Sequence, residues 1–185
     1  MLGVGDWVAR AVYVRCCCGV DGWLRGAWGV VVVITIDEYF SGGSVEKFGA
    51  KLSHPDATEE RQTNARVLLY CANELLAYAK EHGVYGEWVD DDTGSQISGV
   101  QGGAGDGGFR LQKSATGTGK SKHKEGAALD VFDPQDKLDN WLTDETLFRF
   151  KLFREHPDAT KGWCHLQTIP PGWWKEDSEK RTFIP

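Results

Sequence analysis

Ser121-Lys122-His123-Lys124-Glu125-Gly126-Ala127-Ala128-Leu129-Asp130 is the stretch on which the interpretation of the whole chain depends. It places a histidine seven residues before an aspartate, with Gly126 and two alanines between them. The spacing predicts a loop that carries His123, a turn at Gly126, and a buried strand that brings Asp130 back beside the imidazole. Further along, Trp163-Cys164-His165 offers a second imidazole within a short apolar run that is typical of a strand. Two imidazoles and one carboxylate are a sufficient protein ligand set for a hydrolytic zinc ion with one position open for water.

The composition is that of one acidic domain. At 185 residues the chain is long enough to bury a core, and its net charge of −6 argues against a nucleic-acid partner, which would favour a basic surface. The five cysteines include three consecutive ones at 16–18, which favours reduced thiols over a disulfide framework. In a strand Cys164 would point away from the face that carries His165, so core packing is the favoured interpretation for its thiol.

Residues 1–33 differ from everything that follows, because they show neither the period of a helix nor that of a strand. Two interpretations stay open: a signal peptide or anchor, with Arg25 ahead of the apolar run 27–36, or sequence upstream of the domain. The run is too short to cross a bilayer and no small-residue cleavage site follows it, which favours the second interpretation. We therefore expect a non-domain extension at 1–33, a domain at 34–185, and no stable membrane span.

The strongest helical pattern covers residues 56–82. Asp56 and Glu59 fit an N-terminal capping box, apolar residues then recur at helical spacing, and Gly83 ends the pattern. This segment is predicted to be a scaffold helix rather than a site.

Two apolar runs, 127–132 and 163–169, predict strands. Between them, Asp133-Pro134 is typical of a helix start, and residues 154–162 are predicted to be a polar loop. The expected fold is α+β: a small antiparallel sheet that carries the zinc site, packed against a long N-terminal helix.

Two glycine-rich stretches have the form of nucleotide-binding motifs but not their context. Residues 103–108 match G-x-G-x-x-G formally, yet no apolar strand precedes them and no amphipathic helix follows. Residues 117–121 resemble the end of a phosphate-binding loop, but Ser114 stands where that motif needs glycine, and the helix that must follow is not predicted. Neither stretch therefore predicts a nucleotide site.

The pattern Ser121-x-His123-x-x-Gly126-x-Ala128-x-Asp130 resembles the signature S-x-H-x-x-G-x-A-x-D of the zinc D-Ala-D-Ala carboxypeptidases and related phage peptidoglycan peptidases. In that family the signature histidine and aspartate bind zinc, and a later Trp-x-His or Trp-His supplies the third ligand. The resemblance, which covers roughly residues 34–185, therefore implies one zinc ion bound by His123, Asp130 and His165.

The resemblance also implies how a substrate would be held. An aromatic-Arg turn of the family grips the substrate carboxylate, and Phe109-Arg110 takes that place here. A guanidinium suits the role because it can pair with a carboxylate through two parallel hydrogen bonds. Ser121 matches the signature serine, which in the family lies near the substrate.

One position departs from the family pattern. Members carry a glutamate or histidine as general base two or three residues before the last zinc ligand, where this chain has Trp163 and Gly162. Neither can accept a proton. The nearest ionisable groups are Glu155 and Asp158, on the predicted loop, and we favour Glu155 because desolvation over a metal would raise the pKa of its carboxyl toward the useful range.

The expectation that follows from the resemblance is a zinc metallopeptidase that hydrolyses peptidoglycan stem peptides. A D-Ala-D-Ala carboxypeptidase is the first choice, and an endopeptidase of the L-alanyl-D-glutamate type, as in an endolysin, is the close alternative. A non-catalytic, zinc-containing cell-wall-binding module is the second class of interpretation, because the usual base is missing. We expect a monomer that acts at the bacterial cell wall or periplasm, or a phage-encoded protein that reaches the wall without a signal peptide.

Overall fold

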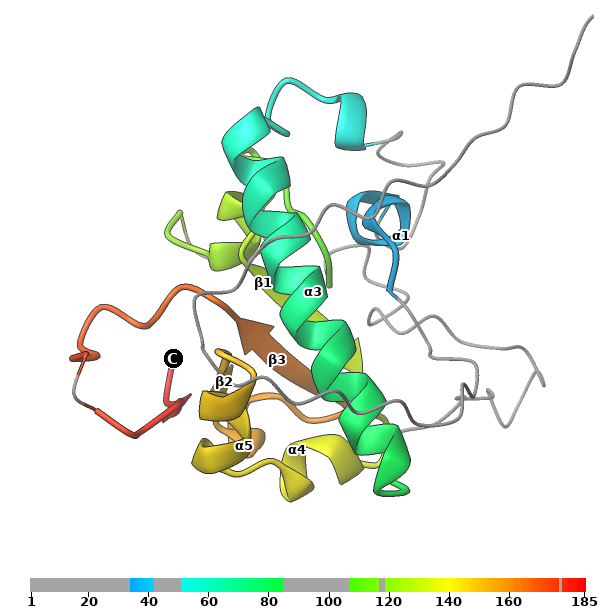
Figure 1. Ribbon diagram of the computed structural model, residues 1–185. Helices are drawn as coiled ribbons and strands as arrows, with labels where there is room; N and C mark the ends of the chain where they lie inside the picture. The colour runs from blue at the N-terminus through cyan, green and yellow to red at the C-terminus, as the bar shows by residue number, and fades with distance from the viewer. Residues whose placement is uncertain (1–33, 42–50, 85–106, 117–118, 177) are drawn as a thin grey trace, which may run out of the picture.

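The computed structural model describes residues 34–41, 51–84, 107–116, 119–176 and 178–185 (Figure 1). Within them the helices are α1 (Ile36–Ser41), α3 (Glu59–Glu81), α4 (Lys137–Trp141) and α5 (Asp144–Arg149), and the 3₁₀-helices are η1 (Lys51–Ser53), η2 (Lys122–Glu125) and η3 (Pro157–Ala159). The strands are β1 (Ala128–Phe132), β2 (Phe153–Glu155), β3 (Trp163–Gln167) and β4 (Thr182–Phe183). The extension at 1–33 and most of the glycine-rich stretch 103–108 lie outside the described residues.

The four strands form one sheet in the order β1-β3-β2-β4. β3 lies at its centre and pairs antiparallel with β1 on one side and with β2 on the other. β4 pairs parallel with β2, so the sheet is mixed and the prediction of an antiparallel sheet was wrong on this point. A two-residue strand that returns to the sheet edge after the connection 168–181 has no periodicity of its own by which to be predicted.

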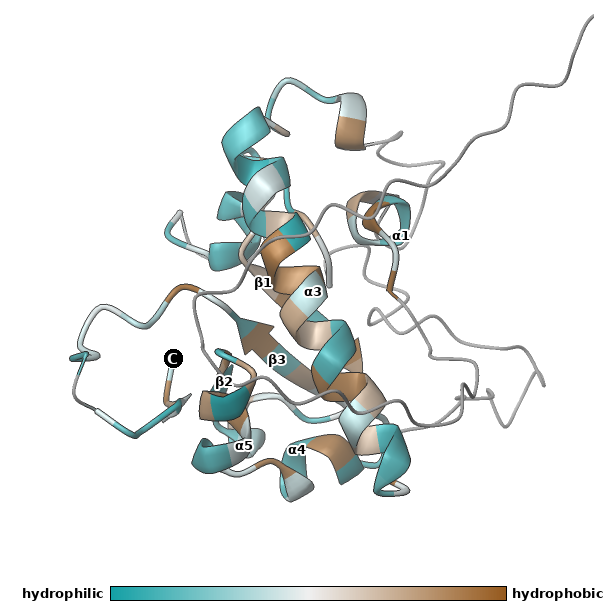
Figure 2. Cartoon of the chain, viewed as in Figure 1, coloured by the Kyte–Doolittle hydropathy of each residue, from teal (hydrophilic) through white to brown (hydrophobic). Residues whose placement is uncertain are grey.

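The long helix α3 lies across the sheet, and its middle turns are apolar (Figures 1 and 2). It is not the N-terminal element, because α1 precedes it. Its N-cap is Thr58, whose side chain accepts a hydrogen bond from the backbone N–H of Arg61, rather than the predicted Asp56. The Asp56 carboxylate instead accepts from the backbone N–H of Gln112, which ties the start of the helix to the segment before the site.

The two faces of the sheet have different neighbours because successive side chains of a strand point to opposite sides. One face packs in the same buried cluster as α3, through these strand residues: Leu129, Val131, Cys164 and Leu166. The Cys164 thiol is fully buried there, as the sequence predicted. The alternate residues of the same strands, Asp130 and His165, therefore point away from α3.

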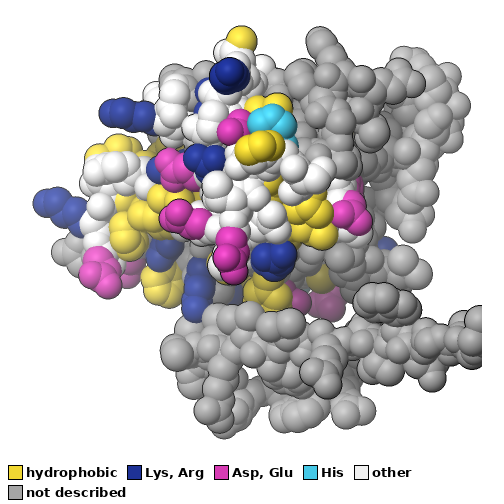
Figure 3. Space-filling view, turned by 90° about the horizontal axis from the view of Figure 1, so that it is seen from above, with side chains coloured by type: hydrophobic (Ala, Val, Ile, Leu, Met, Phe, Trp, Pro, Cys, Tyr) yellow, Lys and Arg dark blue, Asp and Glu magenta, His cyan; other side chains and the backbone are white. Residues whose placement is uncertain are grey.

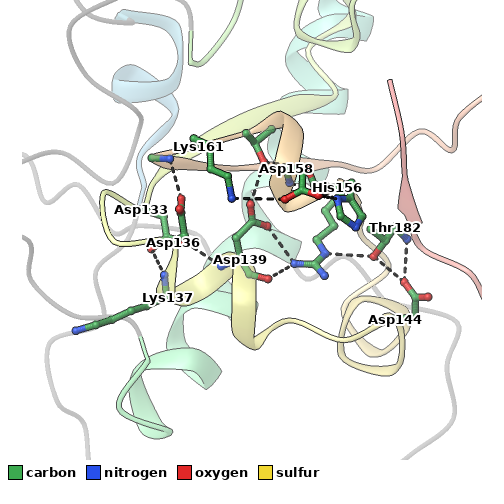
Figure 4. Close-up of polar contacts among 12 residues, drawn as sticks. Asp133, Asp136, Lys137, Asp139, Asp144, His156, Asp158, Lys161 and Thr182 are labelled. Carbon is green, nitrogen blue, oxygen red and sulfur yellow. Dashed lines mark hydrogen bonds and ion pairs between the residues drawn. The ribbon is translucent and has the colours of Figure 1, made fainter.

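The segment predicted as a polar loop, 154–162, is ordered secondary structure instead. Its first residues belong to β2, and Arg154 is buried because its guanidinium donates to both the backbone carbonyl and the carboxylate of Asp139 in α4. The same guanidinium donates to Thr182 of β4, so one side chain joins α4, β2 and β4 (Figure 4). A buried arginine paired in this way gives no apolar signal in the sequence, which is why the strand was missed.

The surface seen from above carries charges of both signs. Across the described part of that face, Lys and Arg side chains are interspersed with Asp and Glu side chains rather than gathered by sign (Figure 3). Among the described helices, none is both long and apolar enough to cross a membrane.

Candidate metal centre

Three segments bring the predicted ligands together. His123 lies in η2, Asp130 in the middle of β1, and His165 in the middle of β3, directly opposite Asp130 in the antiparallel pairing. Gly126 ends η2 in the left-handed conformation, with φ 73°, and so turns the chain from the helix into β1 as its place in the sequence predicted. All three ligand side chains are buried.

The ligand atoms converge on one point. Nε2 of His123 lies 3.3 Å from Oδ1 of Asp130 and 3.3 Å from Nδ1 of His165. That Nδ1 lies 2.7 Å from the same carboxylate oxygen. The buried His–Asp–His group could therefore hold a metal ion.

The hydrogen bonds of the outward-facing ring nitrogens show which nitrogen of each imidazole is unprotonated and presents a lone pair to the site. Nδ1 of His123 lies 2.8 Å from the carbonyl oxygen of Gly108, which can only accept, so Nδ1 donates and Nε2 is unprotonated. Gln167 uses its Nε2 to donate to the Ile169 carbonyl at 2.5 Å, which turns its Oε1 toward Nε2 of His165 at 3.3 Å. Nε2 of His165 therefore carries a hydrogen and leaves Nδ1 free to bind.

Two imidazole lone pairs and one carboxylate oxygen thus face one another in a buried space. Such an arrangement is repulsive unless a cation stands among the three atoms, and a proton or a metal ion can serve. A tetrahedral zinc ion with bonds of 2.0–2.2 Å needs ligand atoms about 3.3–3.6 Å apart. Both distances from His123 Nε2 meet that requirement, and the remaining pair would have to separate by only about 0.6 Å.

The pKa shifts agree with a site that retains a cation. Burial lowers the pKa of His123, and Asp130 offsets this only in part, so the ring stays neutral. Burial would raise the pKa of the Asp130 carboxyl, but the charges and hydrogen bonds of His123 and His165 together hold that pKa below its usual range. Burial also acts to lower the pKa of His165, yet its hydrogen bond to Asp130 and the carboxylate charge reverse the effect and raise it. Of the two imidazoles, His165 therefore binds a proton more readily than His123.

A short segment at 107–110 braces the site from outside the sheet. Gly107 accepts a hydrogen bond from the backbone N–H of Asp130, and the Gly108 carbonyl orients His123. A Cβ on Gly108 would overlap the backbone carbonyl of Tyr39, so only glycine fits. This close approach gives Gly108 a structural reason that is independent of any dinucleotide motif.

Arg110 contacts the candidate metal ligand Asp130. Its guanidinium donates to Oδ2 at 3.0 Å, the carboxylate oxygen that does not face the histidines, and its side chain is 12% exposed. The contact fixes the orientation in which Oδ1 points to the site, a common arrangement around metal-bound carboxylates. The role of Arg110 in holding a substrate carboxylate stays a prediction. Ser121 is half-buried and lies just before η2. Its predicted position near the substrate also stays a prediction.

The two candidate bases differ in where they lie. Glu155 is in β2 rather than in a loop, and its Oε1 is 3.9 Å from Nε2 of His165. Asp158 is in η3 with its side chain 82% exposed, where its carboxylate lies 3.5 Å from Nδ1 of His156 and pairs with Lys161 at 3.7 Å. Glu155 is thus the candidate that reaches the histidine ligand, and Asp158 belongs to a surface cluster (Figure 4).

Gln167 and Phe183 are neighbours of the site that the sequence did not indicate. Gln167 follows the Trp-x-His motif by two residues, so strand alternation could have placed it on the face of His165. The Phe183 ring meets the His165 ring edge to face, with centroids 6.4 Å apart, but only the parallel β4 pairing brings it there.

A scan against protein-family models finds no match for this chain. Searches of curated proteins and of solved structures also find none.

Proposed function

We propose that this chain is a zinc-dependent peptidase that hydrolyses peptidoglycan stem peptides, most simply as a D-Ala-D-Ala carboxypeptidase. The observation that carries the proposal is the convergence of His123 Nε2, Asp130 Oδ1 and His165 Nδ1 in a buried group that could hold a metal ion. Two nitrogens and one oxygen suit zinc, which in hydrolytic sites has three protein ligands and an open position. A zinc ion held by these three residues would supply a Lewis acid that polarises a carbonyl and lowers the pKa of a bound water to about 7.

The chain's own residues would prepare the site for hydrolysis. Gly108 and Gln167 fix the tautomers of the two histidines, and Arg110 fixes the carboxylate of Asp130. Preorganised ligands of this kind keep their geometry while charge develops on the substrate. The support for a peptide substrate is the resemblance of the 121–130 stretch to the carboxypeptidase signature.

Glu155 is the proton acceptor in this proposal. It lies one strand from His165 on the face that carries the metal ligands, and its side chain is 24% exposed, so solvent or substrate can reach it. A carboxylate held 3.9 Å from an imidazole nitrogen needs only a side-chain rotation, or one bridging water, to serve a reaction beside that ring.

A non-catalytic zinc module is the second candidate. It is favoured by Gly162 and Trp163, which occupy the positions where the resembling enzymes carry a base. Peptide hydrolysis distinguishes the peptidase from the non-catalytic module. The purified chain is loaded with zinc and incubated with the pentapeptide L-Ala-γ-D-Glu-L-Lys-D-Ala-D-Ala, and the products are identified by mass spectrometry. Release of D-Ala supports a carboxypeptidase, and cleavage after L-Ala an endopeptidase.

Chelator should abolish either activity, and added zinc should restore it. If zinc is bound with one-to-one stoichiometry and the peptide stays intact, the peptidase proposal fails and the non-catalytic module remains.

A further inference from the structure

The face of the sheet that carries the metal ligands continues beyond them to β4. The β2–β3 register, with Phe153 opposite Gln167, places Phe153 and Glu155 on the same face as His165. The parallel register pairs Glu155 with Phe183, and the residue two before Phe183, Arg181, therefore lies on this face beside Phe153. Arg181 is thus two strands from His165 on the side of the sheet where a substrate would approach.

Three aromatic rings surround the guanidinium of Arg181. Its central carbon lies 4.5 Å from the ring centroid of Phe153, 4.8 Å from that of Phe148 and 5.2 Å from that of Trp174. Phe153 and Trp174 also pack edge to face at 5.3 Å, which fixes two walls of the cage. Stacking on these rings therefore holds the side chain in place.

Arg181 forms no ion pair with any of the described carboxylates, and its buried Nε has no hydrogen-bond partner there. The nearby Asp144 uses Oδ1 for the backbone N–H groups of Arg181 and Thr182 and for the Thr182 hydroxyl, so it anchors the start of β4. Burial lowers the pKa of Arg181, and the charge of the Asp144 carboxylate offsets this only in part. A partly desolvated guanidinium that is fixed in place and forms no close ion pair favours an incoming carboxylate.

The register sets how far this group lies from the metal ligands. Two strand spacings of about 4.8 Å and one two-residue step of about 6.7 Å put the Cα atoms of Arg181 and His165 about 12 Å apart. An extended peptide covers about 10 Å in three residues. A carboxylate at the end of the hydrolysed dipeptide lies too close to the metal to reach Arg181. A carboxylate two or three residues from the hydrolysed bond lies at the right distance.

We propose that Arg181, in its cage of Phe148, Phe153 and Trp174, binds a second carboxylate of the peptide substrate, two to three residues from the hydrolysed bond. The inference rests on the proposed peptidase function. In this proposal the two arginines have different roles. Arg110 supports the metal ligand Asp130, and Arg181 selects peptides that carry an internal acid.

The test uses two forms of the pentapeptide L-Ala-γ-D-Glu-L-Lys-D-Ala-D-Ala, one with the free α-carboxylate of D-Glu and one with that group amidated. Hydrolysis by the zinc-loaded protein is followed by mass spectrometry, and the ratio of kcat/KM for acid over amide is compared between variants. Wild type should prefer the acid by about tenfold or more, as expected for a charge-assisted pair. Arg181→Gln should bring the ratio close to one, and Arg181→Lys should retain part of it.

Arg149→Gln is the matched control, because Arg149 also stacks on aromatic rings, those of Tyr78 and Phe150, but belongs to α5 and contacts α3. It should leave the acid-to-amide ratio unchanged. Calorimetric binding of the acid and amide tetrapeptides that lack the last D-Ala gives a readout independent of turnover, and Arg181→Gln should weaken only the acid form.

The outcomes separate this inference from the function on which it rests. If wild type hydrolyses neither pentapeptide, the peptidase proposal fails and this inference fails with it. If wild type hydrolyses both and the ratio is the same in Arg181→Gln, with metal content and melting temperature at wild-type values, the inference alone is overturned.

Discussion

Asp130 and His165 lie directly opposite each other in neighbouring antiparallel strands, with Oδ1 and Nδ1 2.7 Å apart. Backbone pairing therefore fixes two of the three ligands, and only His123 depends on a separate segment.

Removal of a ligand should abolish stoichiometric metal binding. His123→Ala takes away one of three protein donors and leaves a buried carboxylate and imidazole without their partner, so we expect zinc content to fall from about one ion per folded molecule to near zero. Atomic absorption after dialysis measures it. His156→Ala, at a histidine that is 47% exposed and caps the start of η3, is the matched control and should retain the metal. Full zinc in His123→Ala would show that the ion binds elsewhere.

Acid should weaken metal binding through His165. The hydrogen bond and charge of Asp130 raise the pKa of this imidazole, so proton and metal compete for Nδ1 at a higher pH than for an ordinary histidine. As the pH falls through that raised pKa the protonated fraction grows, and the apparent affinity should drop about tenfold for each further pH unit. Competition with a chromophoric chelator between about pH 5.5 and 8 measures it. An affinity independent of pH over this range would mean that His165 is not a ligand.

Chelation should lower thermal stability. A ligand that binds only the folded state contributes about 2.7 kcal/mol at a free concentration of 100 Kd, and this ion would join η2 to β1 and β3. Calorimetric melting curves with zinc and with excess chelator should differ by several degrees in wild type. The same comparison in His123→Ala should show no difference. Equal shifts in both proteins would assign the stabilisation to another site.

Glu155→Gln should separate metal binding from turnover. The amide keeps the shape of the side chain but cannot accept a proton, so kcat should fall by about 10²–10⁴ while zinc content stays at one. Asp158→Asn changes the exposed acid of η3 in the same way and should retain activity. If instead Asp158→Asn inactivates and Glu155→Gln does not, the assignment of the base is reversed.

Gly108→Ala should destabilise the fold, although Gly108 is not one of the candidate metal ligands. Its Cβ would overlap the Tyr39 carbonyl, and relief of that overlap must displace α1 or the segment that orients His123. Overpacking of this kind costs about 1–3 kcal/mol, which denaturant titration can measure. Gly172→Ala is the control, since nothing lies within 4 Å of the Cβ position there. Equal stability of the two variants would contradict the close approach.

The sequence predicted the local parts of this site and missed those that depend on distant pairing. His123, Gly126 and Asp130 were predicted because a loop, a glycine turn and a buried strand leave short-range patterns. The role of Gln167, the position of Phe183 and the contact between Arg110 and Asp130 arise from strand neighbours and from a segment 20 residues away, which no periodicity reports. β2 was hidden because its buried polar residue, Arg154, looks like a loop residue until Asp139 is seen beside it.

The division of ligands between η2, β1 and β3 also has a kinetic consequence. His123 and Asp130 are close in sequence and can meet as soon as the Gly126 turn forms, whereas His165 joins only when β3 has paired across the connection 133–162, which is 30 residues long. Because closure of long loops is slower than local turn formation, the third donor arrives late in folding. The moment at which a refolding chain captures zinc would therefore mark the docking of β3 onto β1.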